Sequence, residues 1–380
     1  MKKIIKTRRS TSIVTSVTRP SLPPIEDMYN LLESIWESKN LTNGAYYHKL
    51  FESKLADYLD VPFVSLYANA TIGLIAALRA TGIEGEVITT PYSFVATAHA
   101  ISWNNLEPVF VDIDRNSFNI NPDLIEAAIT EKTSAILAVH CYGIPADVEK
   151  LESLAQKYRL RVIYDAAHAF GVKCHCGSIL NHGDLSVVSF HATKVFNTFE
   201  GGAVICKDAE TKSKLDSLKN FGIESETSIP GIGINGKMNE FCSALGILQL
   251  EHIDRYISQR RRIDSLYRKE LAGITGIEVY VMPDVEQHNY SYFPILISGN
   301  YKISRDDLYE RLLENGVHSR RYFYPLISSL KPYQNLKSVQ KNLFSEAYAA
   351  SEKVLCLPIY PDLDSEEVIR ISNIIREFGK

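Results

Sequence analysis

The sequence lacks the features that mark membrane-spanning, secreted and nucleic-acid-binding proteins. None of its 380 residues lies in a run of about 18 apolar residues, so we expect no membrane span. The basic N-terminus, with Lys2, Lys3 and Arg8 among its charges, has no uninterrupted apolar segment of a secretory signal. A formal net charge of −4 does not indicate the basic surface that nucleic-acid-binding proteins generally have. We therefore expect a cytoplasmic protein that binds no nucleic acid.

Cysteine is scarce, and its spacing does not form a disulfide framework. A chain of this size does not need disulfide bonds for stability, so we expect the cysteines to be reduced thiols in a cytoplasm. Cys174, Cys176 and His182 lie close together, but the C-x-C spacing is tight and no convincing second ligand pair follows. The sequence predicts an ordinary loop there and no metal site. The six cysteines are Cys141, Cys174, Cys176, Cys206, Cys242 and Cys356.

A length of 380 residues exceeds one ordinary core, so two domains are expected. The hydrophobic fraction of 45% and charged fraction of 23% are those of a globular protein. Neither an internal repeat nor a low-complexity tract is present. We expect an N-terminal arm over residues 1–16, a large domain over 17–250 and a small C-terminal domain over 251–380.

Apolar β-type runs alternate with helical runs over residues 60–190, which indicates an α/β fold with a mainly parallel sheet covered on both faces. The expected strands are residues 63–67, 86–89, 108–112, 135–139 and 161–165. The expected helices are residues 72–78, 97–103, 124–129 and 148–158. Beyond residue 245 the pattern predicts a smaller α+β unit, with helices at 248–267, 306–315 and 366–378 and strands at 277–281 and 292–297.

Lys194 is the first candidate for catalysis. It follows the apolar run 185–188 and precedes Gly201 and Gly202, which allow close backbone approach. Because burial disfavours an ammonium group, an amine at the end of a buried strand can lose its proton and attack a carbonyl. The ordinary alternative is a salt-bridged lysine at a strand end.

Ligands of parallel α/β sheets gather at the carboxyl ends of the strands. That edge would hold Asp165, Ser189 with Lys194, and the turn at Ala70 and Thr71. Asp165 ends an apolar strand, and a buried carboxylate needs a partner. The partner is either a helix N-terminus or serine, or the protonated nitrogen of a ligand ring.

Two further segments have both a binding and an ordinary interpretation. Asn69, Ala70 and Thr71 precede a helix whose free N–H groups could hold a phosphate, assisted by the Thr71 hydroxyl; Asn69 or Thr71 could equally be a simple N-cap. Phe94 could stack on a planar ring or pack in the core. A lysine, a carboxylate for a ring nitrogen, a phosphate site and a stacking aromatic together describe pyridoxal 5′-phosphate as the cofactor.

These segments resemble the DegT/DnrJ/EryC1/StrS sugar aminotransferases, a family of fold-type I pyridoxal phosphate enzymes. The resemblance runs from Val17 to Phe378, nearly the whole chain. It is strongest in the segments 165–171 (DAAHAFG), 189–194 (SFHATK), 200–203 (EGGA) and 233–240 (GINGKMNE). It implies a mainly parallel seven-stranded central sheet flanked by helices, with a smaller C-terminal α+β domain.

The resemblance also implies roles by position. Lys194 would hold the cofactor and carry the proton, Asp165 would pair with the pyridinium nitrogen, and His168 would lie near the ring hydroxyl. The remaining cofactor contacts that it implies are stacking by Phe94 and phosphate binding by Ala70, Thr71 and Ser189.

Asn235 would reach the phosphate of the neighbouring subunit's cofactor, which implies a homodimer with shared sites. Two positions depart from the family pattern. Asn69-Ala70-Thr71 stands where Ser-Gly-Thr is frequent, and Lys237 stands in place of an arginine. Lysine lacks the bidentate fork of arginine, so any contact of that side chain with a carboxylate or phosphate is altered.

Lys194 stands where related sugar dehydratases have histidine, which favours transamination with L-glutamate as the donor. The runs 191–198 and 320–325 resemble enzymes that act on dTDP-4-keto-6-deoxyglucose at C4, for surface polysaccharide (O-antigen) synthesis. Arg320 or Arg321 would contact the diphosphate, and Tyr322 or Tyr324 the sugar or base; a surface salt bridge is the alternative for the arginines. Two alternatives are amination at C3 of a 3-keto sugar and a non-catalytic regulator that binds pyridoxal phosphate or a nucleotide sugar.

Overall fold

A seven-stranded sheet forms the centre of the chain in the computed structural model, which describes residues 14–341 and 344–379. Its neighbours are parallel except β10, which is antiparallel to both β2 and β9. The predicted α/β class and mainly parallel sheet are confirmed. In spatial order the strands are β2 (Phe63–Tyr67), β10 (Gly202–Cys206), β9 (Leu185–Ser189), β6 (Arg161–Asp165), β5 (Thr133–Val139), β3 (Glu86–Thr89) and β4 (Glu107–Phe110).

Helices cover both faces of this sheet, because successive side chains of a strand point to opposite faces. Leu137 and Ile163 pack in one buried cluster with helices α3 and α4, whereas Ile136 and Val162 pack in another with α2, α5 and α7. The covering helices are α2 (Tyr46–Leu59), α3 (Ala70–Thr81), α4 (Ala96–Trp103), α5 (Val148–Tyr158) and α6 (Ala209–Leu218). The helix expected over 124–129 consists instead of two 3-10 turns, Pro122–Leu124 and Glu126–Ala128.

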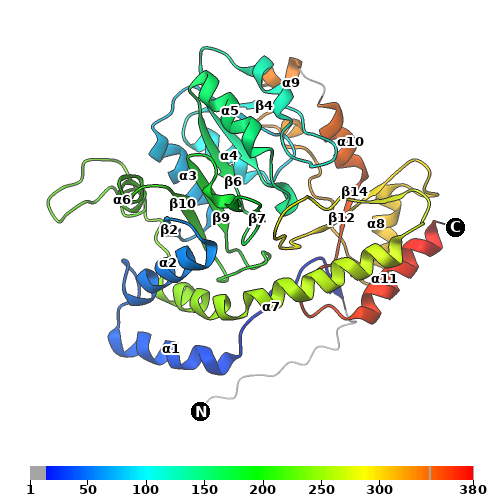
Figure 1. Cartoon of the computed structure of the whole chain (residues 1–380), viewed down its shortest axis with the longest axis horizontal. Helices are drawn as coiled ribbons and strands as arrows, with labels where there is room; N and C mark the ends of the chain where they lie inside the picture. The colour runs from blue at the N-terminus through cyan, green and yellow to red at the C-terminus, as the bar shows by residue number, and fades with distance from the viewer. Residues whose placement is uncertain (1–13, 342–343, 380) are drawn as a thin grey trace.

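The longest element is α7 (Glu240–Leu271), which runs beneath the central sheet and on into the C-terminal part of the chain (Figure 1). Asn239 caps it, with its side-chain oxygen accepting a hydrogen bond from the Cys242 amide. Helix α7 extends beyond the predicted 248–267 at both ends. Residue 250, the expected limit of the large domain, lies within this helix, so the proposed division into domains stays a prediction.

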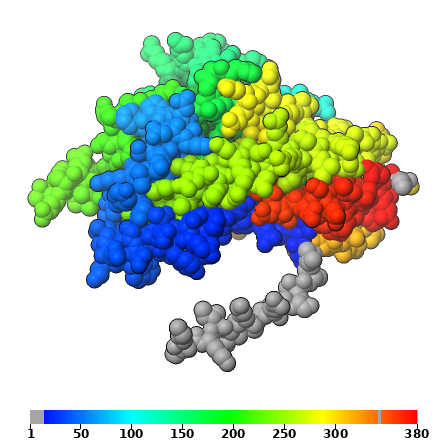
Figure 2. Space-filling view, turned by 60° about the horizontal axis from the view of Figure 1, so that its bottom comes forward, coloured from blue at the N-terminus to red at the C-terminus, as the bar shows by residue number. Residues whose placement is uncertain are grey.

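The C-terminal part is an α+β unit built on a three-stranded antiparallel sheet. Its strands are β11 (Ile277–Val279), β12 (Phe293–Ile297) and β14 (Val354–Leu357), and its helices are α8 (Arg305–Glu314), α9 (Lys337–Lys341), α10 (Ser345–Lys353) and α11 (Ser365–Phe378). Helix α11 lies beside α7 in both views of the molecule (Figures 1 and 2). This arrangement confirms the predicted smaller α+β unit.

The N-terminal residues add two elements that the sequence analysis did not predict. Strand β1 (Thr15–Ser16) pairs in parallel with β13 (Val317–His318), and helix α1 (Ile25–Ser38) follows it. Most of the expected arm, residues 1–13, lies outside the described residues. In the part of the chain that the structure describes, no helix is both long and apolar enough to cross a bilayer.

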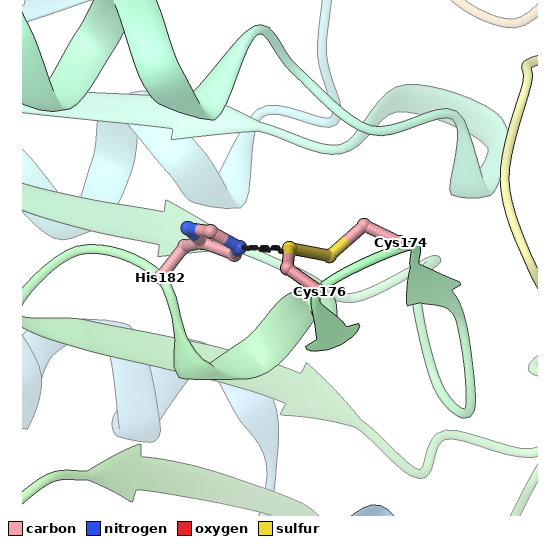
Figure 3. A group of neighbouring side chains, drawn as sticks. All are labelled: Cys174, Cys176 and His182. Atoms are coloured by element: carbon pink, nitrogen blue, oxygen red, sulfur yellow. Dashed lines mark hydrogen bonds between the residues drawn. A yellow bond between two sulfur atoms is a disulfide. The ribbon is translucent and has the colours of Figure 1, made fainter.

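The expectation that all six cysteines are reduced is wrong for Cys174 and Cys176, which form a disulfide (Figure 3). Strands β7 (Lys173–Cys174) and β8 (Gly177–Ser178) make a tight hairpin, and its turn brings the two Cα atoms within 5.2 Å. Such a separation lies within the range that a disulfide requires. The remaining four cysteines are buried free thiols.

Candidate active site

Four strand ends meet at one edge of the central sheet, as expected for a parallel α/β fold. Asp165 is the last residue of β6 and Ser189 the last of β9. Strand β2 ends at Tyr67, just before the start of α3, and β3 ends at Thr89, just before the loop that carries Phe94. The sheet thereby brings together residues that are far apart in the sequence.

Lys194 lies in the turn that follows β9, where its amide donates a hydrogen bond of 2.9 Å to the His191 carbonyl. Its Nζ is 3.2 Å from the Tyr292 hydroxyl oxygen. Burial lowers the pKa of the Lys194 ammonium, although the negative charge of Asp165 opposes this effect. The amine therefore reaches its neutral, nucleophilic form more readily than an exposed lysine.

Asp165 is a buried carboxylate, 5% exposed, with no ion-pair partner in the part of the chain that the structure describes. Its Oδ2 accepts a 2.7 Å hydrogen bond from Thr97 Oγ1, and its Oδ1 accepts a 3.2 Å bond from the Ala167 amide. Because the Thr97 hydroxyl donates its one proton to Asp165, the Ser93 hydroxyl, 2.7 Å from Thr97 Oγ1, must donate its own proton to Thr97 Oγ1. Thr97 was not identified from the sequence, because one polar residue in a short helix is no sign of a site.

The surroundings of Asp165 favour a positively charged partner for its carboxylate. Burial raises the pKa of the carboxyl group, while the bonds from Thr97 and Ala167 and the charge of Lys194 act in the opposite direction. None of the described lysines, arginines or histidines lies within ion-pair distance, 4.0 Å, of it. A protonated ring nitrogen would supply the missing partner, so this carboxylate fits the pyridinium of pyridoxal 5′-phosphate.

His168 is held in one neutral tautomer. The Tyr142 amide donates a 3.1 Å hydrogen bond to Nδ1, so the ring proton must be on Nε2. Nε2 is 3.3 Å from the Tyr292 hydroxyl oxygen and donates to it. Burial lowers the pKa of His168 well below its ordinary value, and the nearby Lys194 charge adds to the shift. His168 is thus a fixed hydrogen-bond donor at neutral pH.

Tyr292 connects these groups, and the sequence analysis missed it. Its hydroxyl oxygen accepts from His168 Nε2 and lies within hydrogen-bond distance of Lys194 Nζ, so its own proton can point to a neutral amine. The residue comes from the segment just before β12, in the C-terminal part of the chain. No sequence signal was available, because the partner lysine is 98 positions away.

The start of α3 offers free amide groups. Asn69 is the N-cap, its Oδ1 accepting a 2.9 Å bond from the Ile72 amide. The Ala70 and Thr71 amides are left without a protein partner among the described residues, and the Thr71 side chain is exposed. N-capping and anion binding are therefore compatible here, and the free N–H groups fit a phosphate.

Ser189 and Gly202 complete this end of the site. They are paired across β9 and β10, and Ser189 is 6% exposed. A Cβ on Gly202 would lie 2.6 Å from the Ala70 nitrogen, so any side chain there would collide with the backbone at the start of α3. The glycine allows the strand and the helix start to approach closely.

A pocket of about 340 Å³ is lined by the residues expected at the substrate. Its walls include Phe94, Arg320, Arg321, Tyr322 and Tyr324, from segments more than 220 positions apart. Phe94 is 59% exposed in this wall, which excludes core packing.

The structure distinguishes the two arginines. Arg321 forms an ion pair with Asp306, with an N–O distance of 2.8 Å, and lies over the Tyr309 ring. Arg320 is exposed and has no carboxylate partner among the described residues, while its guanidinium lies 5.2 Å from the centre of the Tyr322 ring. Arg320 is therefore the cation available to a ligand in this pocket.

Asn235 lies in the exposed segment between α6 and α7, which extends away from the body of the molecule (Figure 1). Its side chain has no partner among the described residues. The next residue, Gly236, accepts a 2.7 Å hydrogen bond from the Ala68 amide, so this segment passes beside the turn between β2 and α3. Lys237, the departure from the family pattern, donates to Asn220 Oδ1 at 2.7 Å.

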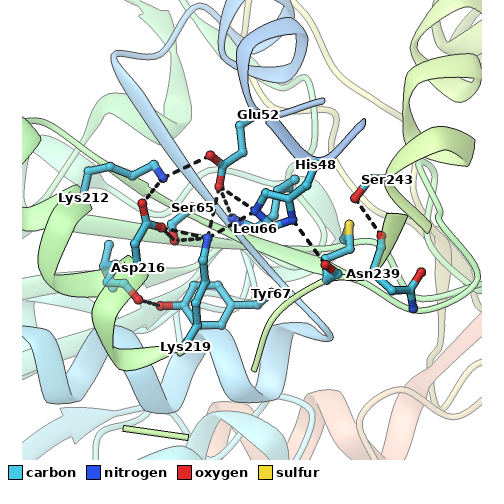
Figure 4. Close-up of polar contacts among 12 residues, drawn as sticks. His48, Glu52, Ser65, Leu66, Tyr67, Lys212, Asp216, Lys219, Asn239 and Ser243 are labelled. Atoms are coloured by element: carbon cyan, nitrogen blue, oxygen red, sulfur yellow. Dashed lines mark hydrogen bonds and ion pairs between the residues drawn. The ribbon is translucent and has the colours of Figure 1, made fainter. Parts of the chain in front are cut away.

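A buried polar network anchors the base of this segment (Figure 4). Lys219 Nζ contacts Asp216 Oδ1 at 2.7 Å, and Glu52 Oε1 and Ser65 Oγ at 3.1 Å each. The backbone carbonyl of Lys219 accepts a 2.9 Å bond from the Gly236 amide. Lys219 thus links the interior to the residue that follows Asn235.

Glu52 is the acceptor at the centre of this network. Burial alone would raise the pKa of its carboxyl group, but the hydrogen bond with His48 and the charges of Lys219 and Lys212 outweigh burial and lower it. The Leu66 amide of β2 also donates to Glu52 Oε1, at 3.0 Å. Glu52 therefore remains ionised in the folded protein and ties α2 to the central sheet.

Comparison with known proteins identifies a family and related structures. A sequence profile of the DegT/DnrJ/EryC1/StrS aminotransferase family matches residues 25–376. The chain is 51% identical over 361 residues to a dTDP-4-amino-4,6-dideoxy-D-glucose transaminase of Shigella dysenteriae, covering 95% of this chain and 98% of the relative. A protein of the same name from Escherichia coli is 50% identical over 364 residues, covering 94% and 97%. The structure of DesI with its TDP-sugar product superposes with a TM-score of 0.92 at 34% identity, covering 97% of this chain and 93% of that one.

Proposed function

Since the chain belongs to the DegT/DnrJ/EryC1/StrS aminotransferase family, we propose that it moves an amino group from L-glutamate to C4 of dTDP-4-keto-6-deoxy-D-glucose. The products would be 2-oxoglutarate and dTDP-4-amino-4,6-dideoxy-D-glucose. The observation that carries the proposal is the half-buried Lys194 amine, held by Tyr292 at the same sheet edge as Asp165 and the free helix start. The relatives named for C4 amination support the choice of sugar.

Pyridoxal 5′-phosphate is the cofactor. When bound, it supplies a carbonyl for an amine and an electron-accepting ring. Lys194 would hold it, Asp165 would keep its ring nitrogen protonated, and His168 would donate toward its ring substituents. The phosphate would be held by the Ala70 and Thr71 amides, with the Thr71 and Ser189 hydroxyls, and the exposed Phe94 ring is available to stack on the cofactor.

The residues around Lys194 set how it handles protons. Burial lowers the pKa of its ammonium, so Nζ can accept a proton from substrate carbon and return it. Tyr292 keeps Nζ oriented, and the fixed His168 tautomer in turn orients Tyr292. The Tyr292 and Tyr322 rings, both from the C-terminal part, pack edge to face with their centres 5.6 Å apart, so that part would form one wall of the site.

Arg320 is proposed as the contact to the substrate diphosphate, because its positive charge is uncompensated beside the pocket that Phe94 lines. Arg321 would hold the wall in place through Asp306. Tyr322 and Tyr324 are proposed to contact the sugar or the base. A guanidinium suits phosphate oxygens because it donates two parallel hydrogen bonds.

A homodimer with shared sites is proposed from the segment that carries Asn235. Its apolar side chains include Ile229 at 62% and Ile232 at 81% exposure, more than an isolated surface loop needs. Helix α1 and the start of α7 add further exposed apolar groups, namely Tyr29, Trp36 and Phe241. Burying these groups against a second copy would bring Asn235 to the partner's phosphate site.

The reaction is tested with purified protein, L-glutamate and a panel of dTDP-, UDP- and GDP-linked keto-sugars, with products identified by mass and NMR. We expect amination at C4 of the dTDP-4-keto sugar and equimolar 2-oxoglutarate. Amination at C3 of a 3-keto sugar would replace the proposed substrate. Tight sugar binding without 2-oxoglutarate would indicate a regulator. Lys194→Ala must abolish turnover, and activity in that variant would refute the mechanism.

The shared site is tested by subunit mixing. Lys194→Ala and Asn235→Ala are each expected to be inactive. After exchange of subunits in equal amounts, about half of the dimers are mixed and each has one intact site, so about a quarter of wild-type activity should return. No recovery in a dimer that has exchanged subunits would show that Asn235 acts within its own chain.

The place of the reaction is also a proposal. The four buried free thiols suit a reducing compartment, so we propose the cytoplasm. The amino sugar would serve surface polysaccharide (O-antigen) synthesis.

A further inference from the structure

The two cysteines of the β7–β8 hairpin and His182 form a cluster of possible metal-ligand atoms that the proposed reaction does not use. His182 Nε2 lies 3.3 Å from Cys176 Sγ and 3.6 Å from Cys174 Sγ (Figure 3). All three ligand atoms lie within 4.8 Å of one another. The sequence predicted no metal site here, because no convincing second ligand pair follows the two cysteines. In the structure, a third possible ligand atom comes from His182, six residues after Cys176.

The imidazole of His182 is oriented as a ligand. Glu152 Oε1 lies 3.3 Å from Nδ1 and also accepts a 2.7 Å hydrogen bond from the Gly183 amide, which fixes its position. A carboxylate at Nδ1 keeps the proton there and leaves the Nε2 lone pair facing the two sulfurs. Histidines that bind metals commonly donate this second ring N–H to a carboxylate, a backbone carbonyl or water.

The cluster is far from the catalytic lysine along the strands. Asp184, two residues after His182, accepts a 2.8 Å hydrogen bond from the Val162 amide, near the beginning of β6. Asp165, at the other end of β6, belongs to the active site. The cluster therefore lies toward the amino-terminal edge of the sheet, where Cys176 is exposed and accessible to ions and small thiols.

We propose that Cys174, Cys176 and His182 bind one ion of the Zn²⁺ class when the two cysteines are reduced. Two thiolates and one imidazole are ligands that zinc prefers, and water would take the fourth position. The disulfide is then the oxidised, metal-free form. A dithiol reductant gives two electrons and two protons to the disulfide and becomes a disulfide itself; the ion next displaces one proton from each thiol.

Full-length protein is reduced with a phosphine and water, which convert the disulfide to two thiols and the phosphine to its oxide. The protein is then separated from the reductant under anaerobic conditions. It is then titrated with Zn²⁺ against a chromogenic chelator. We expect one tightly bound Zn²⁺ per chain in reduced protein and none in oxidised protein. Co²⁺ should give a thiolate-to-metal charge-transfer band together with the visible bands of a tetrahedral site.

Variants test the ligand set. Cys176→Ser and His182→Ala should each weaken Zn²⁺ binding at least 100-fold, and Glu152→Gln about 10- to 100-fold, because it removes only the orienting carboxylate. His175→Ala is the matched control: this neighbouring histidine faces Asp284 at 3.3 Å and should bind Zn²⁺ as wild type does. Equal affinity of wild type and Cys176→Ser, or no Zn²⁺ uptake on reduction, would overturn the proposal. The Co²⁺ spectrum of wild type tests for thiolate ligands without relying on the folding of any variant, and a spectrum that lacks the charge-transfer band would contradict them.

Discussion

Replacing Lys219 with methionine tests whether the buried network holds the segment that carries Asn235. The substitution keeps most of the side-chain volume and removes the charge that faces Glu52 and Asp216. Removing one partner of a buried ion pair costs about 3–5 kcal/mol, since it leaves a buried charge uncompensated. Lys212 still contacts both carboxylates, and Asp216 is 38% exposed, so we expect the lower end, about 3 kcal/mol.

The assay is urea unfolding at pH 7 and one protein concentration, followed by circular dichroism. With a slope of about 3 kcal/mol per M, the midpoint should fall by about 1 M. Lys207→Met is the control, because this exposed lysine has no ion-pair partner among the described residues and should shift the midpoint by less than about 0.2 M. A shift in Lys219→Met no larger than the control would refute the reasoning.

Unfolding at acid pH provides a second test. The pKa of Glu52 is lower in the folded than in the unfolded chain, so its contribution to stability is complete above the ordinary glutamate pKa and is lost as pH falls through the folded-state pKa. In Lys219→Met the folded-state pKa lies higher, because one cause of its lowering is gone. The difference in unfolding free energy between wild type and variant should therefore be constant near neutral pH and narrow only where the pH falls below the folded-state pKa of the variant. A difference that stays constant down to the lowest pH at which both proteins remain folded would mean that the charge of Glu52 is not what Lys219 stabilises.

Four further substitutions test the site. Asp165→Asn cannot keep a ring nitrogen protonated, so kcat, measured as 2-oxoglutarate release, should fall about 100- to 1000-fold while the cofactor still binds. An unchanged kcat would contradict the role assigned to Asp165. Tyr292→Phe removes the hydroxyl at Lys194, and the pH at which the cofactor's visible absorbance titrates should shift, with kcat down about 10-fold. Arg320→Gln should raise KM for the nucleotide sugar about 10-fold at constant kcat. Arg321→Gln removes the ion pair with Asp306 but no proposed diphosphate contact, so it should raise KM less than Arg320→Gln does and lower stability by at most about 1 kcal/mol.

The strands of the central sheet were predictable because burial on both faces leaves a local mark in the sequence. The apolar runs before Asp165 and Ser189 are continuous, and the rule for parallel sheets then places both residues at one edge. Helix α7 was predicted too short, since its first residues, such as Cys242 and Leu245, are buried without the charged face that marked the rest.

The remaining parts of the site depend on contacts between segments far apart in the chain. Tyr292 reaches Lys194, and Lys219 reaches Glu52, only after the chain has folded. The same limit applied to the two arginines. Arg320 and Arg321 are adjacent in the sequence, and only the folded structure shows that Asp306 pairs with Arg321. The Cys174–Cys176 disulfide was missed for a different reason, because its C-x-C spacing was taken as an ordinary loop.

Helix α7 has a mechanical consequence for turnover. Its 32 residues give a rod of about 48 Å that passes unbroken from beneath the lysine-bearing sheet to the part that supplies Tyr292 and Arg320. A hinge between the two parts would have to bend this rod. Substrate exchange is therefore expected to depend on the rotation of side chains such as Phe94 and Tyr324, on the picosecond-to-nanosecond scale, and not on slower domain closure. The separation between the Lys194 amine and the Arg320 guanidinium is therefore set when the chain folds.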